Sequence, residues 1–481
     1  MRVHNAFLQI GLFLAATSLT FGQGTLLGPG VSVTGRCSGH GSEPGCVLPT
    51  LFGDGGLTLF NNPAFPHYAH FVGAAQTTLN QTLSTAIATQ LAILPIISTS
   101  SGFTYEYNSA SGAFVRSNTS FGPIYTERAD TIGHGKFYFG MSYQRFRFGS
   151  LDGIDLKKIP AVFTHVAEQP SQTFLSDVIK TDNSINLNMD QTMLYGTVGL
   201  TDRIDVSLAV PIVSVRMQAS SQASIVRVSG PTFIPAPGAP PVGNPHSFTA
   251  DPNSLSRPYG SSGSASGIGD VTVRVKGKVY QGAYVRVAAA VDIRTPTGDA
   301  RQFLGSGAAG IKPFLAISGG KRFEPHLNIG YQWNGSSILA GNITGTTFSE
   351  DASGNITINN GPATSSRLPS QFFYSAGADY GLTNRVTLAV DYLGQTLISA
   401  PRAFQSSVTT AAIPGGTGAL TLPTVTGGKD TIGLNSGAAG IKINLFGGLL
   451  LTGDILFRLD NKGLRQNITP LVALSYAFGG K

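Results

Sequence analysis

Apolar and polar residues alternate along much of the chain from residue 136 onward, which is the period of a β-strand with two different faces. Around residues 271–279, valines occupy one face, and Thr272, Arg274, Lys276 and Lys278 occupy the other. The same alternation predicts twelve strands, at about 136–148, 186–199, 204–218, 268–280, 284–296, 309–321, 325–335, 370–381, 385–399, 434–446, 449–460 and 468–478. The pattern therefore indicates an all-β protein.

The connections between these strands alternate between short and long. Short turns lie near 201–203, 281–283, 323–325, 382–384 and 446–448, and long connections span about 150–184, 220–266, 337–368 and 401–433. Strands of about ten residues, joined by short periplasmic turns and long outer loops, are typical of a transmembrane antiparallel β-barrel. The strands of soluble sandwiches are shorter, about 5–6 residues.

The number of strands depends on the residues before the first predicted strand. Gly102–Tyr107 and Ala113–Arg128 could form one more hairpin. Adding this hairpin gives fourteen strands, which is our prediction, with twelve as the alternative. Both numbers are even, as in bacterial outer-membrane barrels.

The first residues have the parts of a secretory signal. Arg2 is followed by an almost wholly apolar run at 10–19 and by small residues that favour cleavage before Gln23. After this signal, no uncharged apolar stretch reaches the roughly 18 residues that a spanning helix needs. We therefore expect a signal peptide at 1–22, an N-terminal plug or periplasmic segment at 23–100, and an outer-membrane barrel at 101–481.

The composition fits a wall between lipid and water. Only 12% of the residues are charged and 61 are glycine, whereas about 25% charged residues are usual in globular proteins. The net charge of +7 is scattered along the chain, so we expect no nucleic-acid partner. The expected location is the outer membrane of a Gram-negative-type bacterium, with outer-membrane lipid as a partner.

Motifs for catalysis or cofactor binding do not emerge from the sequence. Gly305–Gly310 matches the dinucleotide pattern G-x-G-x-x-G, but Pro313 and Gly319 disfavour the helix that must follow it. The eight histidines lack a paired metal spacing, and no G-x-S-x-G segment occurs. We therefore expect no enzyme, no catalytic or metal site, and no cofactor.

The N-terminal segment carries two further signals. Cys37 and Cys46 predict a short-loop disulfide in an exported protein, with two free thiols or half a metal site as alternatives. Within 76–97, leucine and isoleucine recur at spacings of three and four, which predicts an amphipathic helix. Such a helix would lie inside the barrel or cover its periplasmic mouth, or it would form a cap without a role in transport.

Charged residues on the inward face of the predicted strands would line the lumen. They are Arg274, Lys276, Lys278, Arg286, Asp292, Arg294, Lys442, Asp454 and Arg458. They would either select anions in an open pore or form an ordinary solvated wall. One of these residues closes a repeat, because Ser306–Lys312 recurs identically as Ser436–Lys442.

Short motifs give the chain a resemblance to two related channel families. Asn62, Pro63 and Ala64 resemble the Asn-Pro-Ala motif in the hatch of FadL-type channels for hydrophobic compounds. From about residue 120 to 478, the chain resembles the sister family named after the MetA pathway of phenol degradation, on the stretches Gly199–Pro211, Gly267–Asp270 and Arg294–Asp299. The final strand, ending in Phe478, resembles the signal that the barrel assembly machinery recognises, although three residues follow it.

The resemblance implies a plugged outer-membrane channel for passive uptake of hydrophobic small molecules, either fatty acids or aromatic compounds. The solute would leave through the lumen or through a lateral opening in the wall. An open general or anion-preferring porin is one alternative, and a surface adhesin or structural barrel is another. Conductance separates the first two, and deletion of the 220–266 connection tests the third.

Overall fold

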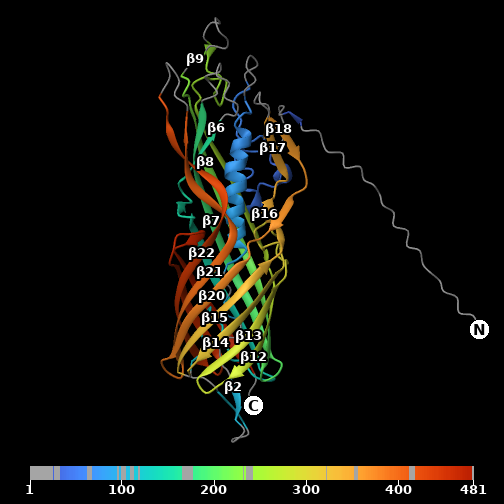
Figure 1. The fold of residues 1–481 in the computed structure, drawn as a ribbon, viewed down its shortest axis with the longest axis vertical. Coiled ribbons are helices and arrows are strands. Elements are labelled where there is room, and N and C mark those ends of the chain that lie inside the picture. The colour runs from blue at the N-terminus through green and yellow to red at the C-terminus, as the bar shows by residue number, and fades with distance from the viewer. Residues whose placement is uncertain are drawn as a thin grey trace, which may run out of the picture.

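A computed structural model describes residues 25–26, 33–61, 68–94, 97–98, 105–108, 113–116, 120–164, 177–230, 232–233, 242–320, 322–350, 356–410 and 418–478. Long, tilted strands form a tall barrel (Figure 1). We call the end with the long connections the loop side and the end with the short turns the turn end. A helix lies in the loop-side half. The predicted signal peptide at 1–22 and the motif Asn62, Pro63 and Ala64 lie outside the described residues. The described part of the chain contains no helix that is both long and apolar enough to cross a membrane.

In the part of the chain that the structure describes, twelve antiparallel strands close the barrel. They are β4 (Phe137–Leu151), β7 (Val178–Gly199), β8 (Ile204–Val226), β12 (Thr272–Gln281), β13 (Val285–Arg294), β14 (Gly310–Gly319), β15 (Phe323–Asn334), β20 (Gln371–Gly381), β21 (Val386–Thr409), β22 (Thr421–Phe446), β23 (Leu449–Arg458) and β25 (Ile468–Phe478). Each pairs with the next along the chain, and β25 pairs with β4 to complete the circle. The prediction of fourteen strands was wrong, and the alternative of twelve matches the structure.

The expected additional hairpin forms, but it does not join the barrel. β2 (Tyr105–Asn108) and β3 (Ala113–Arg116) pair with each other in a separate two-stranded sheet, which lies near the turn end of the barrel (Figure 1). Residues 120–136 form no strand, because side chains on the inner wall bind their backbone groups in place of a neighbouring strand.

Several strands continue beyond the predicted ends, into segments that were expected to be loops. Among the described residues, four further strands join the barrel sheet on the loop side, namely β5 (Ile154–Asp155), β6 (Ile159–Thr164), β11 (Ser256–Ile268) and β24 (Leu464–Gln466). Smaller sheets combine β1 (Thr25–Leu26), β17 (Thr346–Glu350) and β18 (Ile356–Asn360); β9 (Thr232–Phe233) and β10 (Val242–Gly243); and β16 (Ser336–Asn342) and β19 (Thr364–Arg367). The serine- and glycine-rich β11 is a strand because β8 supplies a partner along its whole length.

The outer surface of the barrel is apolar. Along β4, the outward residues Phe137, Phe139, Met141 and Tyr143 are exposed, whereas residues between them face inward. The same inversion occurs on the other strands, with exposed valine, isoleucine, leucine and aromatic side chains. Burial of polar residues and exposure of apolar ones is the pattern of a barrel whose outer face contacts lipid.

The N-terminal segment fills the loop-side half of the lumen. η1 (Gly35–Cys37) and η2 (Pro44–Cys46) are joined by the Cys37–Cys46 disulfide, the pairing expected from the sequence. A helical run follows, made of α1 (Val72–Ala75), the π-helical stretch η3 (Gln76–Leu83) and α2 (Ser84–Leu91). Leu79, Leu83 and Ile87 are buried in one apolar cluster with inward residues of β4, β7 and β8. The main hydrophobic core is therefore inside the barrel, at its loop-side end.

Candidate functional site

An internal cavity of about 170 Å³ lies in the lumen between helix α2 and the segment 120–136. The C-terminal end of α2, with Ala88, Leu91 and Leu94, lines it on one side. Tyr125 and Glu127 of the segment 120–136, which we call the sealing segment, line another part. The remaining lining comes from β7, β8, β12, β13, β14, β15, β20 and β21, together with Asp270, residues 303–306 and Leu339. The barrel thus encloses a chamber and is not an open tube in this structure.

Aromatic and charged side chains meet on the cavity wall. Arg274 holds both carboxylate oxygens of Asp292, with N···O distances of 2.6 and 2.9 Å, and Lys312 Nζ lies 2.9 Å from the same carboxylate. Lys312 Nζ also lies 4.9 Å from the ring centre of Phe373, and the Arg274 guanidinium lies 5.1 Å from that of Phe314. These contacts fix the aromatic rings beside paired charges.

The sealing segment is held to the wall by buried ion pairs. Glu127 accepts hydrogen bonds from Arg274 Nη1 at 2.6 Å and Lys276 Nζ at 3.0 Å. Burial alone would raise the pKa of Glu127, but Lys276 and Arg274 hold the pKa below its usual value. Lys276 also donates to the backbone carbonyls of Arg128 and Asp130. Glu127 therefore stays ionised at neutral pH and ties the segment to β12.

A second set of ion pairs lies nearer the turn end. Arg128, which is fully buried, places Nη2 3.1 Å from Glu324 Oε2. Glu324 also accepts a hydrogen bond from Arg286, which lies 3.0 Å from Asp130. Charges of both signs thus alternate between the sealing segment and strands β13 and β15. We call Arg128, Asp130, Arg286 and Glu324 the latch.

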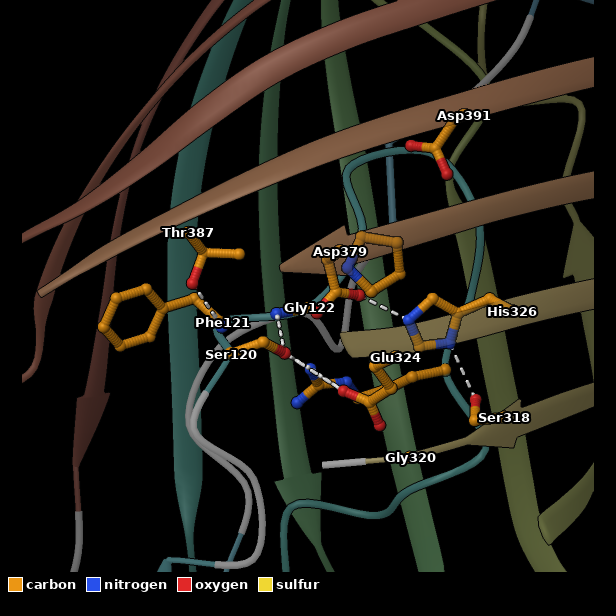
Figure 2. A network of polar contacts seen from close by, with 12 residues as sticks. Ser120, Phe121, Gly122, Ser318, Gly320, Glu324, His326, Asp379, Thr387 and Asp391 are labelled. Carbon is orange, nitrogen blue, oxygen red and sulfur yellow. Dashed lines mark hydrogen bonds and ion pairs between the residues drawn. The ribbon is translucent and has the colours of Figure 1, made fainter. Parts of the chain in front are cut away.

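A buried histidine connects the latch to two further strands. Figure 2 shows His326 between Ser318, whose Oγ lies 2.8 Å from His326 Nδ1, and Asp379, which bonds to Nε2. Ser318 Oγ accepts a hydrogen bond from the backbone N–H of Ala129 at 2.9 Å. Serine, histidine and aspartate thus come together on adjacent strands, but the serine oxygen is buried against the sealing segment. This geometry supports a structural role.

Glu324, His326 and Asp379 also place potential metal-ligand atoms within 4.8 Å of one another. A cation there would lie beside the guanidinium groups of Arg128 and Arg286, which already bind the Glu324 carboxylate. Both nitrogens of His326 already have partners. The chemistry of this group suits the latch better than it suits a metal ion.

Side chains of distant strands also satisfy the backbone of the sealing segment. Asp391 Oδ2 accepts from the N–H groups of Ile124 and Tyr125, at 3.2 and 3.0 Å. Lys442 Nζ donates to the carbonyl of Pro123 at 2.6 Å, and Figure 2 shows Thr387 bound to the N–H of Phe121. These contacts replace the strand ladder that the segment lacks.

The stretches Gly267–Asp270 and Arg294–Asp299, which carry part of the family resemblance, meet in the wall beside the cavity. β11 ends at Ile268 and β12 begins at Thr272, so Gly269 and Asp270 lie in a break between the two strands. The connection after β13 packs against this break. Thr297 Oγ1 donates to the carbonyl of Gly269 at 2.7 Å, and the N–H of Gly298 donates to Asp270 Oδ1 at 3.1 Å. Above this point, β11 pairs with β8, and β13 has ended at Arg294. The wall here is closed by a loop.

The predicted lumen charges lie on the inner wall, but they bind different parts of the molecule. Arg274, Lys276, Arg286, Asp292, Lys442 and Asp454 are buried, and Lys278, Arg294 and Arg458 are partly buried. Four of them, Arg274, Lys276, Arg286 and Lys442, bind the sealing segment. Arg294 binds the carbonyl of Ala92 after α2, and Arg458 donates to Ser150. Most therefore hold the contents of the lumen.

The sequence missed the sealing segment and its partners Glu324, Asp379 and Asp391. The only available signal was the cluster Glu127, Arg128 and Asp130, which is unusual in a strand that would face lipid on one side. The Asn62, Pro63 and Ala64 hatch motif remains a prediction, because it lies outside the described residues.

Comparisons with known proteins give one family match and a set of structural neighbours. The model of the family described as "Putative MetA-pathway of phenol degradation" matches residues 169–421. No curated protein matches the sequence.

Solved structures resemble the fold at low sequence identity. An outer-membrane channel from Pseudomonas putida F1 is 13% identical, covers 73% of this chain and 98% of its own, and gives a TM-score of 0.40. The monoaromatic hydrocarbon channel CymD is 10% identical, with coverages of 72% and 88% and a TM-score of 0.33. The P. putida toluene transporter TodX is 10% identical, with coverages of 72% and 90% and a TM-score of 0.30. At these scores, the function must be inferred from the family and the site.

Proposed function

The chain belongs to the family described as "Putative MetA-pathway of phenol degradation", and from this premise we propose that it is an outer-membrane channel for passive uptake of hydrophobic small molecules. An apolar outer face supports a location in lipid, in the outer membrane of a Gram-negative-type bacterium. Transport, not catalysis, accounts for an obstructed lumen with a chamber. The barrel assembly machinery would insert the chain, as its aromatic final strand suggests.

The observation that carries this proposal is the chamber between α2 and the sealing segment. Its volume of about 170 Å³ is close to that of an engineered apolar cavity of about 150 Å³ that binds benzene. Leu91, Phe314 and Phe373 contribute apolar lining, which favours an uncharged ring over water. A long fatty-acid chain would need more space, so aromatic compounds are the favoured class.

Two routes lead out of the chamber. One runs down the lumen and requires the sealing segment to move. The other runs sideways through the wall where the loop after β13 covers the break at Gly269 and Asp270. The loop is held to residues 269–271 by hydrogen bonds, whereas the sealing segment is held to the wall by buried ion pairs as well, so the sideways route is the one we favour. A hatch role for Asn62, Pro63 and Ala64 belongs to the same proposal.

Filling the chamber tests this function. Ala88→Phe adds a ring to α2 where it lines the chamber, and we expect slower uptake of radiolabelled toluene by Gram-negative cells that express the variant. Ala376→Phe adds the same ring on the exposed face of β20 and serves as the matched control. Both variants must reach the outer membrane in equal amounts.

The outcomes separate the alternatives. Uptake lost in Ala88→Phe and kept in Ala376→Phe supports the channel. High ionic conductance of the intact chain in planar bilayers would support an open porin and overturn the plugged channel. Equal toluene uptake by cells with and without the protein would remove transport and leave an adhesin or structural barrel.

A further inference from the structure

A chain of side-chain amides runs along one wall of the chamber. Asn334 Nδ2 donates to the carbonyl of Pro369 at 2.7 Å, and Asn334 Oδ1 accepts from Arg294 Nη2 and from Gln332 Nε2, each at 2.8 Å. Gln332 Oε1 in turn accepts from Gln371 Nε2 at 2.7 Å. Gln332 and Gln371 are opposite residues of the β15–β20 pair, so the sheet register brings them together.

The direction of this chain is fixed by its two ends. The carbonyl of Pro369 can only accept, so Asn334 must present its NH₂ group to it. Arg294 can only donate, so Asn334 must present its oxygen to Arg294. The orientation of Gln332 follows from that of Asn334, and the orientation of Gln371 follows from that of Gln332. The assignment of the amide oxygens is thus set by the network.

The chain ends on an acceptor without a partner. Gln371 lines the chamber and is 5% exposed, and its Oε1 has no hydrogen-bond partner among the described residues. A buried carbonyl oxygen in this state is unfavourable, because it has lost its hydrogen bonds to water and gained none in return. Gln191 and Thr272 also line the chamber, and in the described part of the chain neither Gln191 Oε1 nor Thr272 Oγ1 has a hydrogen-bond partner. The chamber therefore offers the acceptor oxygens of Gln371 and Gln191, while the Tyr125 hydroxyl and Arg294 Nε line it as donors.

The charges of the chamber are already paired. Asp292 lies between Arg274 and Lys312, Glu127 binds Arg274, and Arg294 Nε lies 3.7 Å from Asp270. The three acids and three bases in the lining balance each other. An anionic solute would therefore gain no uncompensated positive charge. A neutral solute with an O–H or N–H group would satisfy the unpartnered oxygen.

Resting on the proposed function, we propose that Gln371 selects single-ring aromatic solutes that carry a neutral hydrogen-bond donor, such as a phenolic hydroxyl or an aromatic amine. The ring lies beside Phe373, which follows Gln371 by two residues on the same face of β20. The donor meets Gln371 Oε1 after a small rotation about the last side-chain torsion of the glutamine, whose energy well is broad. The amide chain from Pro369 to Gln332 prevents the glutamine from turning its NH₂ group to the solute instead.

Binding of matched solutes to the purified full-length chain tests this assignment. Calorimetry at pH 7 would compare phenol, which is neutral there, with anisole, which has the same ring and oxygen but no donor, and with toluene. We expect phenol to bind about threefold to tenfold more tightly than anisole and toluene, from one neutral hydrogen bond. Gln371→Leu keeps the bulk of the side chain and should remove this preference while toluene still binds.

A control variant separates acceptor chemistry from general polarity. Gln144 on β4 is equally buried and its Oε1 also has no hydrogen-bond partner, but it does not line the chamber. Gln144→Leu should leave the preference for phenol unchanged. Equal affinity for phenol and anisole in the unaltered chain would overturn the role of Gln371, and so would a preference that survives Gln371→Leu. Failure of all three solutes to bind would instead refute the channel function on which the inference rests.

Discussion

The latch predicts how firmly the sealing segment closes the turn end of the barrel. Arg128→Met replaces the guanidinium with an uncharged side chain of similar length. The change removes the 3.1 Å contact to Glu324 and the 3.2 Å hydrogen bond to Ser120. Glu324 then keeps Arg286 as its remaining cationic partner in the latch. The variant therefore weakens the closed arrangement without removing the segment.

The size of the effect follows from burial. Both partners of the Arg128–Glu324 pair are fully buried, and removing one partner of such a pair costs about 3–5 kcal/mol. Because Arg286 continues to compensate Glu324, we take the lower value of about 3 kcal/mol. At about 1.4 kcal/mol per factor of ten, the released form becomes roughly a hundredfold more populated.

Single-channel recording in planar bilayers measures this population. Openings should be rare in the unaltered chain and about a hundredfold more frequent in Arg128→Met. Arg458→Met is the matched control, because Arg458 is a lumen arginine that donates to Ser150 and does not touch the sealing segment. Glu324→Gln should open the barrel in the same way, and the double variant should add less than the sum of the two.

One result would refute this reasoning. If Arg128→Met inserts as a heat-resistant folded barrel and remains as closed as the unaltered chain, the ion pair does not hold the segment. The hydrogen bonds from Asp391, Thr387 and Lys442 to its backbone would then be sufficient for closure.

Three further predictions concern other parts of the molecule. Replacing Cys37 and Cys46 with serine removes a cross-link between two residues that lie nine positions apart, which costs about 3 kcal/mol of stability on the chain-entropy estimate. Hydrogen exchange should then increase in residues 33–60, while β22, β23 and β25 stay protected. Gly440→Val should lower the free energy of unfolding of the barrel by about 1–3 kcal/mol in thermal unfolding, because a Cβ there would lie 2.6 Å from Asp454 Oδ2. Gly433→Val on the same strand is the control, because a Cβ at Gly433 meets nothing within 4 Å. Equal losses of stability in the two variants would contradict this prediction. Burial and the neighbouring His246, which is bonded to Asp177, lower the pKa of His70 to about 4. The unfolded chain therefore binds more protons than the folded chain between pH 6.5 and 4, and the folded form loses stability as the pH falls through this range. The protection factors of α1 against hydrogen exchange, corrected for the intrinsic rate at each pH, should therefore fall as the pH falls through this range, and His70→Gln should flatten the change.

The strand positions were predictable from the sequence because a two-sided barrel wall imposes period two on each strand. The limits of the strands were not, since β11 is polar on both faces and is a strand only through its pairing with β8. The repeat Ser306–Lys312 and Ser436–Lys442 also acquires a reason. Gly310 lies under Arg294 and Asn334, and Gly440 lies under Asp454, so each glycine makes room for a lumen side chain of the next strand.

The sealing segment could not be predicted, because its partners are far away in the sequence. Ile132 binds Asp205 across 73 residues, and Phe121 binds Lys442 across 321 residues. No local period records such contacts. Gln371 was hidden for a similar reason, since its free oxygen depends on a hydrogen-bond chain through Gln332, Asn334 and Arg294 on two other strands.

The pairing of β25 with β4 closes the barrel around residues that precede β4 in the chain. The helical run lies in the loop-side half and the sealing segment in the turn-side half, so the polypeptide passes lengthwise through the ring that its own later residues form (Figure 1). Such threading sets an order of events during biogenesis. The N-terminal segment must occupy the growing curved sheet before the first and last strands meet, because afterwards its folded, disulfide-linked end would have to be pulled through a closed ring. Once closed, the ring becomes a kinetic trap that retains the segment even when individual contacts break.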